Sequence, residues 1–598
     1  MSDGIVGRLG NKVFDPVEHA VNGRDRRALI VGAALAPLVG CGRGAGPRHA
    51  EDWVGANAAR GHRARDRKAA GVPAPEITHR ASAIVVGAGV SGLAAARELA
   101  RAGIDDVQLL ELEDEPGGNS RGHRIAGMPC PLGAHYLPLP GAHAVEVIAL
   151  LEALGLRRTE HGRVVYDEPT LCHAPQERLY IGGFWHEGLL PPLDALPRAE
   201  RVETRAHYRK FSAAVDAAGA GGAFAMPTAR SAWSARLDAL DAVSFAAWLD
   251  AQGLTAPALR WYLDYCCRDD YGAGATQVSA WAGLHYFASR HGFHGPGDEG
   301  DKPADERDGV LTWPEGNAWL ARRLAANWSE RMHTACVVLR IAETRDEVVV
   351  DAWNAREQRA ERWIAPQLVL AVPLFVAARL IDAPPTALTQ TVQAMPHAPW
   401  LVGNLHLADV LEEHPGAPRS WDNVFYDAGG ASPTLGPALG YVDAMHQSTR
   451  SIPGPTVLTA YWALGGNSPF EASAQRARLL AEPWSFWSAA VVSELARAHP
   501  DLPAKLERVD LMRYGHAMSV PVPGLRSSAA LRALGAPGAS GATNHGRVHF
   551  GHSDLSAYSV FEEALYWGTR AGAAAAQQLH RRRNRRCDGP GFSATRCR

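Results

Sequence analysis

The stretch from Ala83 to Gly118 constrains the fold most, because it has the pattern of a strand, a glycine turn, a helix and a second strand. Three glycines follow the first apolar run in the spacing G-x-G-x-x-G: Gly87, Gly89 and Gly92. Such glycines allow a tight turn, close approach of the backbone to a pyrophosphate and tight packing of helix on strand. The helix that begins there directs unpaired N–H groups at phosphates, and Glu111 ends the second strand where it can bind an adenosine ribose.

The glycine motif alone is weak evidence, because the chain contains 60 glycines. Here the first strand, the helix, the second strand and the terminal acid all fall in register, which favours dinucleotide binding. A glycine-rich turn in an ordinary α/β unit is the alternative interpretation. We therefore predict an α/β domain that binds an adenine dinucleotide.

The doublet Gly117-Gly118 follows Glu111 closely and makes the prediction more specific. An acid followed by a Gly-Gly doublet resembles the superfamily of flavin-containing amine oxidases and phytoene desaturases. The resemblance implies FAD in place of NAD. Noncovalent binding is expected because no Cys is clearly placed for attachment to the flavin, and Cys336 falls on the adenine side. It also implies a Rossmann-like FAD-binding domain of the GR2 type with an inserted α+β substrate domain.

Other segments resemble the same superfamily, in the order that it predicts. The matching segments are the loop 131–136, the turn and helix at 313–320, the strands 335–341 and 368–373, and the strand and helix at 546–571. The resemblance is specific over these parts and loose over the long insertions between them.

The matching segments divide the chain into discontinuous domains. The expected divisions are an export signal (1–41), a linker (42–79), the FAD-binding domain (80–150, 311–385 and 506–580), the substrate domain (151–310 and 386–505) and a basic tail (581–598).

The resemblance also implies which residues contact the cofactor. They are Gly87, Gly89, Val90, Ser91, Gly92, Glu111, Leu112, Gly118, Asn119, Arg121, Gly133, Ala134, His135, Tyr136, Val338, Asp554 and Phe561. The backbone of Val338 would meet the adenine, and Asp554 or Ser553 would replace the usual Glu that binds the ribityl chain.

The sequence departs from its relatives at the catalytic end. Amine oxidases of this superfamily commonly place a Lys near the flavin, but this chain has no Lys between Ala371 and Ala504, and Val402 falls near that position. The catalytic residues therefore stay open, with His135, Tyr136, Tyr461 and Tyr514 as candidates. Further polar residues that could act in the pocket are His285, Asn404, His516, His552 and Tyr558.

Composition excludes several other classes. A net charge of −2 over 598 residues argues against nucleic acid as a main partner. The eight cysteines show no metal-ligand spacing, and most of them are expected to be buried small apolar residues, with one disulfide as the alternative. His545, His549 and His552 lack a carboxylate cluster that would complete a metal shell, so no metal is expected.

The N-terminal segment has the features of an export signal. Arg26-Arg27 precedes a short apolar run and resembles a twin-arginine signal, and Leu38–Cys41 resembles a bacterial lipobox with Cys41 as the lipidated residue. We therefore expect an exported protein, periplasmic or anchored to the membrane by lipid. The alternative is a cytoplasmic protein with an incidental apolar segment.

These observations predict an FAD-dependent oxidoreductase that acts on a small or medium-sized organic substrate. Amine oxidation is the first hypothesis, with hydride transfer to the flavin. The alternatives are a desaturase or isomerase of an apolar, carotenoid-like substrate, and a flavoprotein with a binding or electron-transfer role. The electron acceptor, O₂ or a quinone, stays open.

Overall fold

The computed structural model describes residues 53–290, 292–295, 309–426, 436–448, 450, 452–536 and 545–587. The expected export signal, Cys41 and residues 588–598 of the expected basic tail lie outside these residues. So does the first part of the expected linker. Among the described helices, none combines the length and the apolar character that crossing a membrane requires.

A five-stranded parallel sheet forms the centre of the dinucleotide-binding part. Its strands, in spatial order, are β12 (Met332–His333), β3 (Val107–Leu110), β2 (Ala83–Val86), β16 (Leu368–Leu370) and β22 (Val548–Phe550). Three segments that are far apart in the sequence supply these strands, as the superfamily resemblance predicts. Most of their side chains are apolar, as expected for a parallel sheet that is covered on both sides, and the exceptions are Gln108, His333 and His549.

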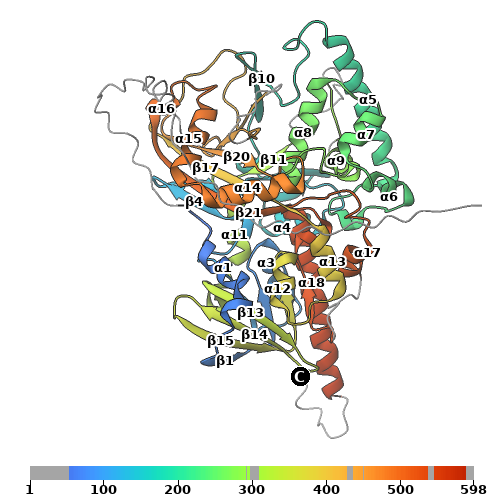
Figure 1. The fold of residues 1–598 in the computed structure, drawn as a ribbon, viewed down its shortest axis with the longest axis vertical. Helices are drawn as coiled ribbons and strands as arrows, with labels where there is room; N and C mark the ends of the chain where they lie inside the picture. Colours follow the sequence, from blue (N-terminus) through green and yellow to red (C-terminus); the bar gives the residue numbers. More distant parts are fainter. Residues whose placement is uncertain are drawn as a thin grey trace, which may run out of the picture. The chain divides into compact units, whose positions relative to one another are not determined.

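Each face of this sheet has its own cover. Because side chains alternate along a strand, Val85 joins the core formed with helices α3 (Val90–Arg101) and α18 (Phe561–Cys587). Ile84 and Val86 instead join the core formed with a second sheet. This second sheet contains, in order, β1 (Ile77–Arg80), β15 (Arg359–Ala365), β14 (Val348–Asn354) and β13 (Cys336–Glu343). The second sheet and helices α3 and α18 lie in the lower part of Figure 1.

A seven-stranded mixed sheet forms the other part. Its spatial order is β10 (Phe184–Glu187), β9 (Glu177–Ile181), β18 (Asp422–Phe425), β19 (Tyr441–Asp443), β20 (Thr456–Ala463), β17 (His397–Leu407) and β21 (Leu506–Ser519). The sequence places residues 506–519 in the FAD-binding domain, but β21 pairs with β17 along its length. The division expected at residue 506 is therefore wrong for this strand, whose apolar pattern fits either sheet.

Helices cover both faces of the seven-stranded sheet. Leu401 and Leu405 of β17 pack toward α14 (Pro469–Ala481) and α15 (Trp484–Leu495). Trp400 and Val402 face the larger core. That core also contains residues of α5 (Arg201–Gly219), α6 (Ala235–Asp241), α7 (Phe245–Ala251), α8 (Pro257–Tyr271) and α9 (Ala280–Ala288).

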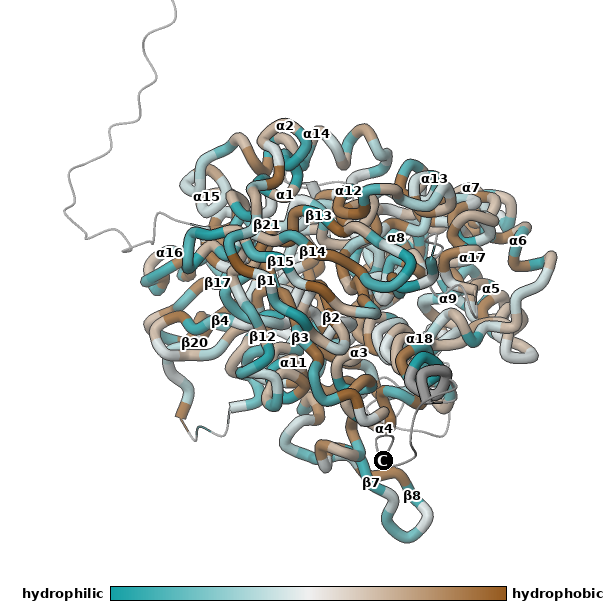
Figure 2. Tube along the Cα trace, turned by 90° about the horizontal axis from the view of Figure 1, so that it is seen from below, coloured by the Kyte–Doolittle hydropathy of each residue, from teal (hydrophilic) through white to brown (hydrophobic). Residues whose placement is uncertain are grey.

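Shorter elements complete the described fold. They are α4 (Val145–Ala153), α11 (Ala318–Ala325), α12 (Leu374–Leu380), α13 (Thr386–Ala394), α16 (Leu502–Lys505), α17 (Ala529–Gly535), and the hairpins or pairs β4 (Gly122–Ile125) with β5 (Met128–Pro131), β6 (Tyr136–Pro138) with β11 (Val310–Thr312), and β7 (Arg157–Glu160) with β8 (Arg163–Tyr166). The β7–β8 hairpin lies at the periphery in Figure 2, whereas β2 and α3 lie in the interior.

Two terminal expectations need correction. The region 42–79 is expected to be a linker, yet its described part contains α1 (Ala58–Arg65), α2 (Arg67–Ala70) and most of strand β1. Polar contacts of α1 and main-chain pairing of β1 hold this segment on the rest of the protein. It therefore needs no periodic apolar pattern. At the other end, the expected tail from 581 continues helix α18 to Cys587.

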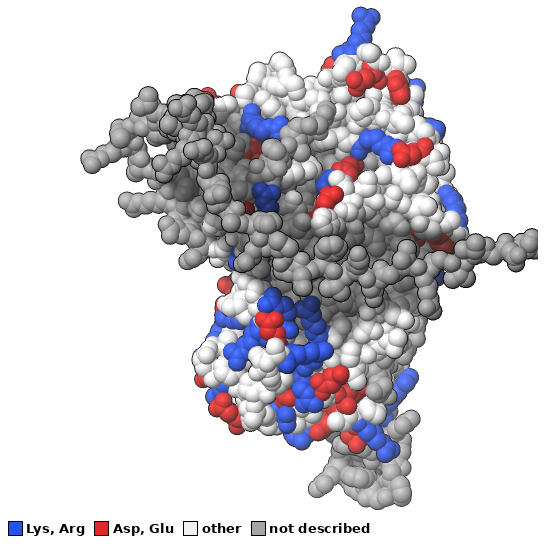
Figure 3. All heavy atoms as spheres, viewed as in Figure 1, with Lys and Arg blue, Asp and Glu red and all other residues white. Residues whose placement is uncertain are grey.

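Charged side chains of both signs are mixed on the face drawn in Figure 3. Lys and Arg gather there over α1, with acidic side chains between them. Such a mixed surface agrees with the net charge of −2.

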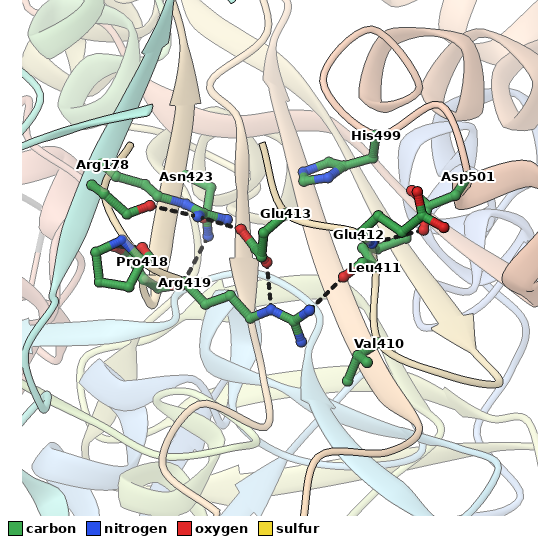
Figure 4. A network of polar contacts seen from close by, with 12 residues as sticks. Arg178, Val410, Leu411, Glu412, Glu413, Pro418, Arg419, Asn423, His499 and Asp501 are labelled. Atoms are coloured by element: carbon green, nitrogen blue, oxygen red, sulfur yellow. Dashed lines mark hydrogen bonds and ion pairs between the residues drawn. The ribbon is translucent and has the colours of Figure 1, made fainter. Parts of the chain in front are cut away.

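A buried polar network fixes the long segment that follows β17 onto the edge of the seven-stranded sheet (Figure 4). The Arg178 guanidinium donates to Asn423 Oδ1 (2.6 Å) and to Glu413 Oε2 (2.8 Å), and it stacks on the Trp185 ring. Arg419 donates to Glu413 as well. With Arg178 only 2% exposed, this network is a structural ion-pair cluster.

Candidate functional site

One large cavity, of about 420 Å³, follows the carboxyl ends of the parallel strands. The residues directly after β2, β3 and β16 line it: Gly87, Glu111 and Ala371. Open α/β sheets bind their ligands at this edge. The cavity extends from there to β17, β20 and β21 of the seven-stranded sheet, which contribute Val402, Tyr461 and Tyr514.

The glycine turn after β2 brings helix α3 close to the strand. A Cβ atom at Gly92 would lie 1.8 Å from the Gly87 carbonyl oxygen, so a larger residue does not fit. Gly89 caps α3 without a side chain, which leaves the first N–H groups of the helix facing the cavity. This arrangement is a ready-made anion site.

The Gly117-Gly118 doublet packs directly on that turn. The Gly117 N–H donates to the Ala88 carbonyl (2.8 Å), and a Cβ at Gly118 would lie 3.2 Å from the Gly89 Cα. Gly118 has a φ of 58°, in the left-handed region that favours glycine. The two glycine motifs therefore form one cradle at the phosphate-binding end of the cavity.

Glu111 is held in place by the backbone around it. Its carboxylate accepts from the Ala88 N–H (2.6 Å) and from the Glu113 N–H (2.9 Å). Burial raises the pKa of Glu111, and the two N–H donors oppose that effect. Each carboxylate oxygen has a further lone pair, so the group can still accept from hydroxyls of a ligand.

Asp554 carries an orphaned oxygen in the cavity wall. Its Oδ2 accepts from the Leu374 N–H (2.9 Å) and pairs with His397 Nε2 (3.2 Å). Its Oδ1 has no hydrogen-bond donor among the described residues, because His552 Nδ1 accepts from the Asp554 N–H. Burial would raise the pKa of Asp554, but His552 and His397 outweigh it and hold the pKa well below its ordinary value. Oδ1 lies 3.4 Å from His552 Nδ1, but it accepts no hydrogen bond from the described residues. A buried, charged oxygen of this kind fits a hydroxyl donor such as the ribityl chain of FAD.

Most of the residues predicted to contact the cofactor line this cavity. They are Gly87, Gly89, Val90, Ser91, Glu111, Leu112, Gly118, Asn119, Gly133, Ala134, His135, Tyr136, Val338, Asp554 and Phe561. Gly92 and Arg121 do not line it. Gly92 serves the contact of helix on strand, and Arg121 donates to the Gly118 carbonyl (3.1 Å) and so braces the cradle.

All four candidate catalytic residues also line the cavity. The His135 ring stacks on Tyr461 at 4.5 Å between centroids, and burial lowers the pKa of His135 to about 4, so the ring is neutral. The Tyr461 and Tyr514 hydroxyls donate to the carbonyls of Gly133 (3.1 Å) and Leu132 (2.9 Å). Both tyrosines therefore hold the loop that carries His135.

The further polar candidates separate into two groups. His516 and His552 line the cavity, as does Val402, which falls near the usual position of the Lys. His285 lies within α9 against the Ala225 carbonyl (3.0 Å), and Asn404 donates to the Pro131 carbonyl (3.0 Å). Tyr558 donates to Asp270 behind the cavity wall.

Sequence reasoning missed a group of charged residues in the wall of the cavity. Asp269 and Asp270 end helix α8, Arg290 follows α9 and Glu562 begins α18. Arg290 pairs with Asp270 (3.0 Å) and donates to the Tyr558 hydroxyl (2.9 Å). The signal in the sequence is an adjacent acid pair inside an aromatic, otherwise buried helix.

Asp269 and Glu562 are left without a cation of their own among the described residues. Tyr136 donates to Asp269 Oδ2 at 3.4 Å. Burial raises the pKa of Asp269 to about 7, helped by the charge of Asp270, and burial raises the pKa of Glu562 to about 7 as well. A cation in the cavity would favour the charged forms of both groups.

The fold and this cavity define a dinucleotide-binding protein. The part of the cavity wall that carries the aromatic and acidic residues is here called the chamber. The family model for flavin containing amine oxidoreductases matches residues 90–576. The chain belongs to this family, which confirms the superfamily, the FAD cofactor and the oxidoreductase class predicted from the sequence.

Individual relatives share less of the chain. Polyamine oxidase 7 of Oryza sativa subsp. japonica is 40% identical over 60 residues, which are 10% of this chain and 13% of that protein. A triple mutant of putrescine oxidase has a similar fold, with a TM-score of 0.59, 20% identity and coverage of 84% of this chain and 100% of that one. Cyclohexylamine oxidase from Brevibacterium oxydans gives a TM-score of 0.56 at 20% identity, with 84% and 99% covered. The fold prediction is thereby confirmed.

Proposed function

We propose that this protein oxidises an amine with noncovalent FAD as cofactor. The observation that carries the proposal is a single cavity that joins the glycine cradle to the chamber with unpaired Asp269 and Glu562. When bound, FAD supplies the hydride-accepting chemistry. Gly89, Glu111 and Asp554 would hold its phosphates, ribose and ribityl chain.

The residues of the chamber suit a substrate that arrives as a cation. The ordinary amine is protonated near neutral pH and has to lose that proton before its C–H bond can give up a hydride. Asp269 is the residue placed to attract the ammonium group and to accept its proton, because it lies in the wall with a pKa near neutrality. Arg290 is already paired with Asp270, so it leaves Asp269 free for this role.

The aromatic residues shape the chamber and keep it apolar. Trp400, Tyr461 and neutral His135 present ring faces or edges beside the acids, and Tyr136 orients Asp269 through its hydroxyl. Ring faces attract cations, and the apolar walls exclude water. An apolar, carotenoid-like substrate would leave the two carboxyl groups buried without a partner, which disfavours the desaturase alternative.

The test is anaerobic mixing of the holoprotein with a panel of primary amines, diamines and polyunsaturated lipids. Loss of the visible flavin absorbance with an amine supports the proposal and needs no assumption about the electron acceptor. Bleaching by none of the amines, with turnover of a lipid, would contradict it. Adding O₂ or a soluble quinone to the bleached protein then identifies the acceptor, which we expect to be one of these two.

We also propose that the protein is exported and that Cys41 carries a lipid. This proposal rests on residues 26–41 alone. Mass determination of the mature N-terminus tests them. A lipid-modified N-terminal Cys41 supports membrane anchoring, and an uncleaved Met1 contradicts it.

A further inference from the structure

The segment from Trp53 to Ala70, here called the N-terminal strap, lies before residue 90, where the family match begins. It contains α1 and α2, and its first residue pairs with Leu511 of β21. Figure 1 shows α1 beside the dinucleotide-binding part, near α12 and β13. The segment therefore reaches from the seven-stranded sheet to the edge of the cofactor cavity.

The strap grips the loop that follows Glu111. The Asn57 N–H donates to Glu113 Oε2 (3.0 Å), and Arg60 donates to the Leu112 carbonyl (3.2 Å) and to Asp114 (3.0 Å). The same loop supplies the Glu113 N–H that orients Glu111. The strap thus fixes the carboxylate predicted to bind the ribose.

The strap also grips the phosphate cradle from outside. Arg121, which braces Gly118, donates through its other arm to the Gly55 carbonyl (2.9 Å). The Val54 N–H donates to the Leu511 carbonyl (2.9 Å). Gly55 has a φ of 85°, in the left-handed region that favours glycine, and a Cβ there would press on the Met512 side chain, 2.4 Å from its Sδ.

Helix α1 supplies part of the cavity wall itself. Ala64 lines the cavity, together with Leu112, Cys336 and Val338 of the expected adenine end. Arg63 stacks on the Trp353 ring at 3.8 Å, and Arg67, only 9% exposed, pairs with Asp382 at 3.7 Å. Arg63 of α1 thus contacts β14, and Arg67 of α2 contacts the residue Asp382 that follows α12, on a face where basic side chains gather (Figure 3).

We propose that the N-terminal strap is a cofactor-binding element that closes the adenosine end of the FAD site and slows the release of FAD. The proposal rests on the FAD cofactor of the family and not on the amine substrate. Arg60 and Asn57 act by holding the 112–114 loop, and Ala64 acts by direct contact with the adenosine end.

Two variants of the full chain test the strap. Arg60→Ala removes both contacts of that side chain with the loop, and Ala64→Phe fills the wall of the cavity. FAD binding to the apoprotein, measured by quenching of flavin fluorescence, is expected to weaken at least tenfold in each variant, which is about 1.4 kcal/mol. The rate of FAD release, measured by stopped flow, should rise by a similar factor.

Arg65→Ala is the matched control. Arg65 lies on the same helix and carries the same charge, but it pairs only with its exposed neighbour Asp66. We expect its FAD affinity to equal that of the wild type, and the apoprotein melting temperatures of all three variants to agree within a few degrees. The proposal for the strap would be overturned if both Arg60→Ala and Ala64→Phe kept the FAD affinity and release rate of the wild type.

The outcome is separate from that for amine oxidation. If every variant keeps the wild-type FAD affinity and amines bleach the flavin, the proposal for the strap is overturned and the proposed function stands. Weakened FAD binding in a protein that no amine bleaches supports the strap and contradicts the proposed function. If Arg65→Ala lost as much FAD affinity as Arg60→Ala, the effect would come from the positive charge of the helix, and the proposal for the strap would again be overturned.

Discussion

At the scale of single residues, the account depends on how burial changes ionisation. Asp269, Glu562 and His135 face the same cavity, and burial pushes each toward its neutral form. Asp554 stays charged because two histidines outweigh its burial. The cavity wall therefore holds one fixed anion, Asp554, and two carboxyl groups, Asp269 and Glu562, that titrate near neutrality.

Asp269→Asn tests the proposed role of this carboxylate in accepting the proton of the amine. Because the amide cannot accept the ammonium proton, kcat/KM for the best amine is expected to fall by roughly 10²–10⁴-fold. FAD affinity should stay at the wild-type value. Asp250→Asn, an exposed acid of α7, is the control and should keep full activity. Undiminished kcat/KM in Asp269→Asn would contradict the role of this carboxylate.

The pH profile supplies a second prediction at this scale. Since the pKa of Asp269 is raised to about 7, the carboxyl is protonated below that pH and ionised above it. The kcat/KM of the wild type should therefore rise with pH through about 7 and level off above it. In Asp269→Asn this limb should be missing, and its persistence would assign the titration to another group.

At the scale of elements, helices α3 and α18 determine the cofactor end, because both begin at the cavity and pack on each other through small residues. A Cβ at Gly568 would lie 2.0 Å from the Ser91 carbonyl oxygen, and one at Gly572 would lie 2.5 Å from the Ala95 carbonyl oxygen. Close packing of this kind fixes where each helix begins.

Gly568→Val should therefore push α18 away from α3. We expect the free energy of unfolding to fall by about 1–3 kcal/mol, which is typical of overpacking, and FAD binding to weaken. Ala573→Val adds a side chain to an exposed position of the same helix and should change neither quantity. Thermal melting and FAD titration of both variants make the comparison. Equal results for the two would refute the packing argument.

A substitution in the Arg178 network is expected to change stability without changing FAD affinity. Arg178→Ala leaves Glu413 and Asn423 without their buried partner and should lower the free energy of unfolding by about 3–5 kcal/mol. The affinity for FAD should stay unchanged, because the network lies outside the cavity. Urea unfolding and FAD titration measure the two quantities, and a loss of FAD affinity in the folded variant would contradict this separation.

How much the sequence predicts also depends on the element. The glycine turn and the place of Glu111 follow from local patterns, because glycine spacing and apolar runs are encoded within a few residues. The strap was missed because its contacts are polar and long-range, as between Asn57 and Glu113. The sheet that β21 joins could not be predicted either, since strand pairing depends on partners far along the chain.

The acid pair Asp269-Asp270 shows the same limit for the site. Its residues stand out only when α8 and α9 bring Arg290 to one of the two carboxylates and leave the other without a cation. The residues expected to contact the cofactor could be proposed from local motifs, and their contact with FAD stays a prediction. Apart from Gly92 and Arg121, they line the cavity.

At the scale of the whole molecule, the cavity unites two sheets whose strands come from separate stretches of the chain. Cys336 is the cysteine that lines it in the described part of the chain, and burial raises the pKa of its thiol. A thiol that stays protonated is a poor nucleophile for attachment to a flavin. Denaturing the holoprotein in acid should therefore release all of the FAD into the supernatant, whereas yellow colour in the pellet would show covalent attachment.

The most direct measurement for the whole account is a crystal structure of the holoprotein with FAD. The adenosine should lie between Glu111 and Ala64, the pyrophosphate on the turn at Gly89, a ribityl hydroxyl on Asp554, and the flavin ring beside His135 and Tyr461. FAD in another part of the molecule, or a flavin ring remote from Asp269, would contradict the account.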